Sequence, residues 1–380
     1  MTSNLPDNQQ DNATKDHTNH MNSALDLARR GLGNVWPNPA VGCVIVQSGR
    51  VVGRGWTQPT GRPHAETEAL RRAGDLAAGA TAYVTLEPCN HHGQTPPCTD
   101  ALIAAGIKKV VIATQDPDRR VAGSGVRRLK EAGLEIEFGV CKSEADKVNQ
   151  GFFSRIEHAR PYITLKIATT LDGKIATLSG ESQWITGDFA RRAAHKLRAE
   201  HDAIMIGSGT AVADDPSLTC RLPGISNARR PRVVLDGRLR FSPNSKLAHS
   251  AKDVPVIVFT LQGDETHQEK VEHLKSLGVS VQVAPKELIK VDVNWVAKEL
   301  ASRGITRLFV EGGGTLAASL LKADLVDQIT WFRAPSVIGN DGLSAIEGLN
   351  LDKLAEMPKF IRKSLIQLDE DCLEILSRKR

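Results

Sequence analysis

The chain has 380 residues, of which 41% are hydrophobic and 24% charged, a composition typical of globular proteins large enough for two or three domains. Its net charge is +5, and neither half carries the concentrated positive charge expected of a nucleic-acid-binding protein. The sequence has no apolar stretch long enough to span a membrane and no export signal, so we expect a cytoplasmic protein without membrane or nucleic-acid partners.

The N-terminal third alternates predicted helices and strands. Residues 1–20 are polar and predict a disordered tail. A first domain is expected over residues 21–143, with helices at 21–31, 64–74, 95–106 and 124–133 and strands at 40–46, 50–56, 80–88, 108–117 and 134–140. The first two strands are joined by a short turn and predict a hairpin. Such alternation indicates a sheet covered by helices.

A polar helical segment over residues 144–160, which ends at Arg160-Pro161, predicts a linker helix between two domains. The second domain is expected over residues 161–380. Its predicted strands lie at 162–170, 202–207, 231–236, 254–260, 279–284, 306–312 and 327–339, with helices at 188–200 and 315–323 among those between them.

The stretch "EPCNHHGQTPPCTDAL" places Cys89 and Cys98 around a loop that contains His91 and His92. A disulfide is not indicated, because the six cysteines are scattered through a large chain expected in a reducing compartment. Thiolates and imidazoles are zinc ligands, so the loop indicates a zinc site. If His91 or His92 were the fourth ligand, the site would be closed and structural, as in a non-enzymatic binding module.

A third ligand is available upstream in "GRPHAETEAL", where His64 precedes a predicted helix. The order H-x-E followed by P-C…C is that of zinc deaminases, although here eight residues separate Cys89 and Cys98. Two thiolates and one imidazole leave one zinc position for water, whose pKa falls to about 7. Glu66 lies two residues from His64, a spacing that does not share a helical face. This favours Glu66 as a proton shuttle rather than a ligand.

These motifs, with "PNPAVGCVIV", "QDPDRRVAGSGVRRLKEAG", "LKIATTLDGKIAT", "SGESQWITG", "GTAVADDPSLTCR" and "VEGGGTLAASLL", resemble the bifunctional riboflavin-biosynthesis deaminase–reductase family from about residue 21 onward. The resemblance implies an α/β fold with an N-terminal cytidine-deaminase-like three-layer domain and a C-terminal dihydrofolate-reductase-like domain. It also implies zinc-dependent deamination of 2,5-diamino-6-ribosylamino-4(3H)-pyrimidinone 5′-phosphate. Reduction of the ribosyl group to ribityl by NADPH would follow.

Carried over by resemblance, one zinc per chain is held by His64, Cys89 and Cys98, Glu66 moves protons, and Asn38 contacts the pyrimidine. The family's NADP contacts correspond to Ala168, Trp184, Thr210, Asp214, Gly237, Gly313, Gly314, Thr315, Leu316, Ala317, Ala318 and Ser319. Its substrate contacts correspond to Ser182, Arg198, Leu218, Arg221 and Glu311. The two arginines suit a phosphorylated substrate. We expect a homo-oligomer, a dimer or a tetramer.

Several alternatives stay open at this point. "VEGGGTLAAS" lacks the Rossmann glycine order and does not separate NADPH from NADH. Lys166 and Asp172 are both candidates for the proton donor in the reduction. A polynucleotide deaminase with an accessory domain is a rival function, but it predicts an aromatic, basic groove in a chain that is only 4% aromatic.

Overall fold

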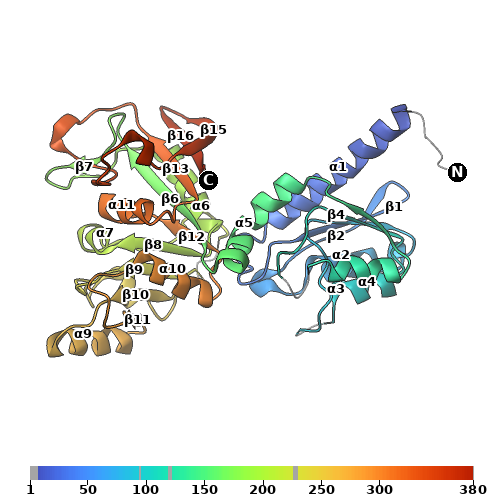
Figure 1. Ribbon diagram of the computed structural model, residues 1–380, viewed down its shortest axis with the longest axis horizontal. Coiled ribbons are helices and arrows are strands. Elements are labelled where there is room, and N and C mark those ends of the chain that lie inside the picture. The colour runs from blue at the N-terminus through green and yellow to red at the C-terminus, as the bar shows by residue number, and fades with distance from the viewer. Residues whose placement is uncertain (1–6, 94–95, 119–121, 226–229, 380) are drawn as a thin grey trace. The chain divides into compact units, whose positions relative to one another are not determined.

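The computed structural model describes residues 7–93, 96–118, 122–225 and 230–379, with side chains from residue 15 onward. The chain divides into two compact units at His158/Ala159 (Figure 1). Each unit is built around its own β-sheet.

The first unit contains α1 Asp7–Arg29, β1 Gly42–Gln47, β2 Arg50–Trp56, α2 Ala65–Ala73, β3 Thr81–Val84, α3 Cys98–Ala104, β4 Lys109–Ile112, α4 Ser124–Glu131, β5 Glu135–Phe138 and α5 Lys142–His158, with short 3₁₀ turns at Pro59–Gly61 and Gly74–Ala77. The sheet order is β2-β1-β3-β4-β5. Strands β2, β1 and β3 are antiparallel neighbours, whereas β3, β4 and β5 are parallel.

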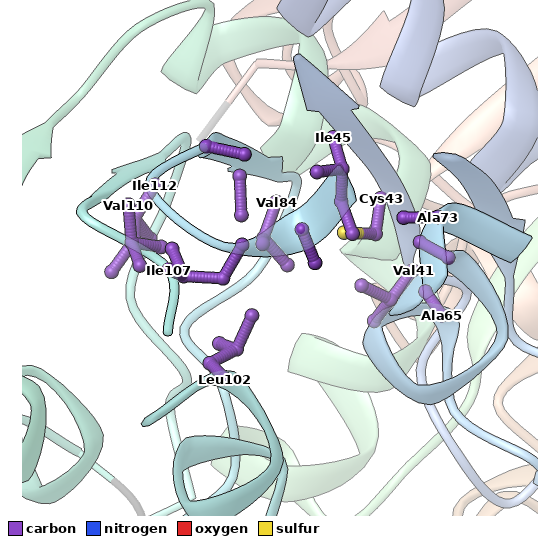
Figure 2. Packing of buried hydrophobic residues seen from close by; sticks show 14 of the residues in the cluster. Val41, Cys43, Ile45, Ala65, Ala73, Val84, Leu102, Ile107, Val110 and Ile112 are labelled. Carbon is purple, nitrogen blue, oxygen red and sulfur yellow. The ribbon is translucent and has the colours of Figure 1, made fainter. Parts of the chain in front are cut away.

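Alternating residues of β1 supply both faces of this sheet. Cys43 and Ile45 pack with α2, α3 and α4, and Figure 2 shows this cluster. Val44 and Val46 point the other way and pack with α1 and α5. The result is the predicted three-layer arrangement, with helices on both faces of one sheet.

Two boundaries differ from the sequence-based expectation. Helix α1 starts at Asp7, so the disordered tail expected for residues 1–20 is wrong from residue 7 onward. The His17 imidazole anchors this part of the helix, with Nδ1 2.8 Å from the Tyr83 hydroxyl. The segment expected as a linker forms α5, which packs on α1 through Ala145 and Val148 and belongs to the first unit. Because the sequences of both helices are largely polar, they did not indicate which side of each helix is buried.

The second unit contains strands β6 Tyr162–Thr169, β7 Lys174–Thr177, β8 Ala203–Gly207, β9 Arg232–Leu235, β10 Val256–Thr260, β11 Ser280–Val283, β12 Arg307–Val310, β13 Gln328–Arg333, β14 Gly342–Ser344, β15 Phe360–Leu368 and β16 Asp371–Arg378. Its helices are α6 Asp188–Ala199, α7 Ser208–Asp214, α8 Lys246–His249, α9 Glu265–Ser276, α10 Val293–Ser302 and α11 Gly314–Lys322, with 3₁₀ turns at Gly339–Asp341 and Leu354–Glu356.

The main sheet of this unit has the order β11-β10-β9-β8-β12-β6-β13-β16-β15. All neighbours from β11 to β13 are parallel, and their apolar runs are buried because helices cover them. The antiparallel β15–β16 hairpin and the small β7–β14 pair were not predicted. Strand β15 lies at the sheet edge and is largely exposed, so its sequence lacks a clear buried face.

None of the described helices combines the length and the apolar character that a membrane crossing requires.

Candidate active sites

The predicted zinc ligands converge at one point in the first unit. His64 is the N-cap residue of α2, Cys98 is the first residue of α3, and Cys89 lies in the loop after β3. The His64 Nδ1 atom is 3.2 Å from Cys98 Sγ and 3.6 Å from Cys89 Sγ. All three ligand atoms lie within 4.8 Å of one another. Tetrahedral zinc bonds place N and S ligands about 3.6 Å apart, so this donor set fits zinc.

Electrostatics also favour a metal-ligating thiolate. Hydrogen bonding from the Cys98 thiol, and secondarily from His64, lowers the pKa of Cys89 to about 4. The thiolate is the form of cysteine that binds zinc. The backbone N–H of Cys98 also donates to Cys89 Sγ over 3.4 Å, and this hydrogen bond keeps the two cysteines close together.

Glu66 occupies the first turn of α2 and is only 4% exposed. Burial raises the pKa of its carboxyl, although the neighbouring His64 partly offsets this. Among the described residues, the metal-ligand group is His64, Cys89 and Cys98, without Glu66. His91 and His92 are exposed and also stand outside this group. The closed structural site considered from the sequence is therefore not what the described residues form.

Two further buried carboxylates lie near the ligands and were not singled out from the sequence. Glu87 accepts the backbone N–H groups of Gly123 and Gly125, both over 3.0 Å, and so holds the start of α4. Burial raises the pKa of Asp116 to about 6. Glu87 belongs to the "EPC" motif, so its position two residues before Cys89 could have indicated from the sequence that it lies near the zinc ligands.

Asn38, the predicted pyrimidine contact, is positioned by a glycine. A Cβ atom added at Gly61 would lie 1.8 Å from Asn38 Nδ2. Gly61 also has φ +87°, a conformation that side chains rarely adopt. The turn between β2 and His64 therefore requires glycine to leave room for the Asn38 amide.

Gly61→Ala should lower kcat/KM for deamination roughly 10- to 100-fold while zinc content stays unchanged, because the Asn38 amide must move. Steady-state ammonia release and metal analysis measure the two effects. Gly49→Ala is the matched control, since Gly49 has φ +75° but no neighbour within 4 Å of the added Cβ. Equal losses in both variants would show that backbone strain, not Asn38, is responsible.

The second unit contains a charged cluster, Lys166, Arg198 and Glu311, where the end of β12 lies beside the middle of β6. Leu165 of β6 pairs with Val310 of β12, which brings the next residues, Lys166 and Glu311, side by side. Arg198 on α6 donates to both carboxylate oxygens of Glu311, over 2.5 and 3.0 Å. Burial lowers the pKa of Lys166, and Glu311 partly offsets that effect.

Arg198, which the family resemblance implies is a substrate contact, is also held by partners within the protein. Its third donor, Nη1, contacts the Thr219 carbonyl over 2.9 Å, so each of these nitrogens already has a protein partner. Arg221 is exposed, and its Nε lies 3.4 Å from the His195 ring. Arg198 therefore fixes the position of the Glu311 carboxylate, whereas Arg221 lies at the surface.

A cavity of about 490 Å³ lies beside this cluster, along the ends of β8, β9, β10 and β12. Six of the twelve predicted cofactor contacts line it: Thr210, Gly237, Gly313, Thr315, Leu316 and Ser319. The other six do not line it: Ala168, Trp184, Asp214, Gly314, Ala317 and Ala318. Ala317 and Ala318 are buried on the inner face of α11.

Of the remaining predicted residues, Asp214 interacts with Lys166, and Leu218 precedes Thr219, whose carbonyl accepts from Arg198. Asp214 ends α7, and a charge interaction with Lys166 partly offsets the burial that raises its pKa. Trp184 is 65% exposed, with the Arg191 guanidinium 4.7 Å above its ring. Ser182 is half-buried, and Leu218 is buried with φ +51°. Sequence reasoning missed the basic side chains of the cavity, which are described below.

Residues 14–114 match the cytidine and deoxycytidylate deaminase zinc-binding region, and residues 161–373 match the RibD C-terminal domain. Together with the ligand group and the cavity, these matches define a zinc-dependent deaminase joined to a reductase. The chain is 44% identical to riboflavin biosynthesis protein RibD of Aquifex aeolicus, over 95% of this chain and 98% of that protein. It is 43% identical to RibD of Escherichia coli, over 94% and 98%.

Solved structures of proteins of this kind have the same fold over nearly the whole chain. Acinetobacter baumannii RibD superposes with a TM-score of 0.85 at 38% identity, covering 97% of this chain and all of that one. A Thermotoga maritima diaminohydroxyphosphoribosylaminopyrimidine deaminase/5-amino-6-(5-phosphoribosylamino)uracil reductase gives 0.85 at 35% identity, with the same coverage. The chain belongs to the RibD family.

It is therefore a bifunctional deaminase–reductase of riboflavin biosynthesis, with zinc and NADPH as cofactors. The predicted family, fold class and cofactors are confirmed. Membership of this enzyme family excludes the non-enzymatic binding module.

Proposed function

We propose that the chain catalyses the two reactions in the name of its Thermotoga relative. The diaminopyrimidine phosphate loses an amino group as ammonia, and the resulting phosphoribosylaminouracil is then reduced to the ribityl compound. The observation that carries this proposal is the presence of two chemically different sites in separate units. One is the His64, Cys89 and Cys98 group beside Glu66, and the other is the charged cluster beside the cavity.

In the deaminase unit, His64, Cys89 and Cys98 would hold zinc, which when bound supplies Lewis-acid activation of water at neutral pH. Glu66 is buried beside these residues and lies on the same helix as His64. Its carboxylate accepts a proton from the attacking water and delivers it to the ring nitrogen and then to the departing amine. Asn38 orients the pyrimidine from the turn that Gly61 keeps open.

In the reductase unit, the reduction breaks the C1′–O4′ bond of the ribosylamine. When bound by the residues that line the cavity, NADPH would supply the hydride equivalent for C1′, and a proton must reach O4′. We assign this proton to Lys166, because burial lowers its pKa and it lies beside the Arg198–Glu311 pair. Asp172 is the weaker candidate, since its carboxylate accepts the Thr170 hydroxyl over 2.6 Å and the Gly339 N–H over 2.6 Å.

The predicted site residues and domain limits remain proposals. We place deamination in residues 21–143 and reduction in residues 161–380; helix α5 follows the first of these ranges and packs on its core. Arg221 binds the substrate phosphate and Glu311 contacts the ribose side, while Ser182 and Leu218 complete the pocket. This proposal is supported by Arg198, which joins Glu311 to the Thr219 carbonyl in the segment between Leu218 and Arg221.

The direct test is to incubate the zinc-loaded protein with the diaminopyrimidine phosphate in the absence of NADPH and to identify the product by mass spectrometry. We expect release of one ammonia and formation of the deaminated ribosylaminouracil phosphate. Recovery of unchanged substrate would reject the proposed substrate, and release of phosphate or ribose instead would reject the reaction.

We further propose that the protein is a cytoplasmic homo-oligomer, a dimer or a tetramer, that acts on a small molecule rather than on nucleic acid. The support is an exposed apolar edge on β15, where Ile361, Leu365 and Ile366 are 45%, 59% and 42% exposed. An edge strand of this kind offers unpaired backbone groups, and a second copy of the chain would cover it.

Leu365→Lys should shift the protein toward the monomer in light scattering coupled to size exclusion, because a charge enters the covered edge. Leu76→Lys is the matched control, since Leu76 is equally exposed at 59% but lies in the first unit. A monomeric wild-type protein, or an unchanged oligomer in Leu365→Lys, would contradict this interface.

A further inference from the structure

The residues that line the cavity of the reductase unit follow the order of the strands in the sheet. Its walls come from the ends of β12, β8, β9 and β10, which are consecutive neighbours. The charged cluster with Lys166 and Glu311 lies at the β12 and β6 side. Reduction requires the nicotinamide next to the substrate, so the cofactor must run from β12 toward β10. Three strand spacings amount to about 14 Å, enough to place the adenosine half at the β9–β10 end.

Basic side chains collect at this adenosine end. Three cations line the cavity, namely Arg238 and Arg240 from the loop after β9 and Lys290 from the segment before α10. Arg238 and Arg240 are both exposed, and Arg240 Nη2 donates to the Ser208 hydroxyl over 2.6 Å. This hydrogen bond holds the Arg240 guanidinium at the start of α7, where Ser208 also lines the cavity.

The adenosine end of the cavity also contains a buried carboxylate with one oxygen that accepts no hydrogen bond from the described residues. Asp236, which follows β9, lines the cavity and is 1% exposed. Its Oδ2 accepts the Phe241 N–H over 2.6 Å, but Oδ1 has no hydrogen-bond partner among the described residues. A buried carboxylate oxygen without a partner is costly, which points to a ligand donor at this place. It is also the single acidic residue among those that line the cavity.

We propose that Arg238 and Arg240 bind the 2′-phosphate of NADPH and thereby select NADPH over NADH. The inference rests on the reductase function of this unit. A phosphate monoester carries close to two negative charges and accepts charge-assisted hydrogen bonds from guanidinium groups. NADH presents a hydroxyl at the same place and would leave both arginines without this partner. Asp236 Oδ1 accepts a hydroxyl or amino donor that both cofactors share, so it does not discriminate between them.

The test is calorimetric binding to the zinc-loaded full chain, which needs no turnover. The ligands are NADPH and NADH, with adenosine 2′,5′-bisphosphate and adenosine 5′-monophosphate as adenosine-end probes. Arg240→Ala should weaken NADPH and the bisphosphate about 10- to 100-fold and leave NADH and the monophosphate nearly unchanged. Arg238→Ala should act in the same direction. Arg240→Lys should recover part of the affinity, because it keeps the charge but loses the two-pronged geometry.

Arg303→Ala is the matched control, because this arginine pairs with Glu299 at the far end of α10 and should leave all four affinities unchanged. Equal losses for NADPH and NADH would place the arginines at the shared diphosphate and overturn the inference. Unchanged NADPH affinity in both alanine variants would overturn it as well, because that affinity would itself show that the reductase unit is folded. A wild-type protein that binds neither cofactor would contradict the reductase function itself.

Discussion

Glu66→Gln should release ammonia from the diaminopyrimidine phosphate at least about 10²- to 10⁴-fold more slowly than the wild-type protein. The glutamine side chain keeps nearly the same shape in the first turn of α2 but cannot accept and return a proton. Glu66 is 4% exposed, so bulk buffer has little access to replace it. Initial rates of ammonia release, measured with substrate in excess, give the loss directly.

Two companion measurements separate this chemical loss from a structural one. Zinc content should stay at one per chain in Glu66→Gln, because Glu66 is not in the ligand group, and should fall in Cys89→Ser. Glu66→Gln should also oxidise NADPH normally when supplied with the already deaminated substrate. A variant that loses zinc or both activities would assign Glu66 a structural role, and near-normal deamination would reject it as the proton carrier.

Lys166→Gln should slow NADPH oxidation with the deaminated substrate about 10²- to 10⁴-fold, while ammonia release in the other unit continues unchanged. The neutral amide cannot deliver a proton to O4′ of the opening ribose. It also leaves the Arg198–Glu311 pair without its neighbouring cation. Single-turnover NADPH oxidation, with cofactor binding measured separately, distinguishes lost chemistry from lost affinity.

The pH dependence of the reduction gives an independent check on Lys166. A proton donor must be protonated, so the rate should fall as pH rises through the pKa of this amine. Burial lowers that pKa below the ordinary value of about 10.5, so the fall should begin at lower pH than for an exposed lysine. Asp172→Asn should leave this profile in place. If Asp172→Asn abolished the alkaline limb and Lys166→Gln did not, the two assignments would be reversed.

The zinc site could be predicted because its ligands stand at element ends within one short stretch of chain. His64 opens α2, Cys98 opens α3, and Cys89 follows β3, so the sequence order already implied convergence. The three-layer fold followed from the alternation of helices and strands. The helical start of the chain was missed because its buried contacts, such as that of His17 with Tyr83, join residues 66 apart.

The reductase site was less predictable because its contacts depend on strand order. Arg198 and Glu311 are 113 residues apart, and their pairing arises from the placement of α6 against the end of β12. The sequence predicts Arg198 as a substrate contact, but nothing in it indicates the pairing with Glu311. The sequence does not indicate a binding role for Arg240, because basic residues are common in polar loops. Its significance appears only once the loop after β9 is seen to line the cavity.

The most direct test of two independent sites in one chain is to record ammonia release and NADPH oxidation in parallel from the diaminopyrimidine phosphate. We predict that ammonia appears at the same initial rate with or without NADPH, and that NADPH oxidation begins after a lag and ends at one equivalent per ammonia. NADPH oxidation that precedes ammonia release, or ammonia release that requires NADPH, would contradict the account.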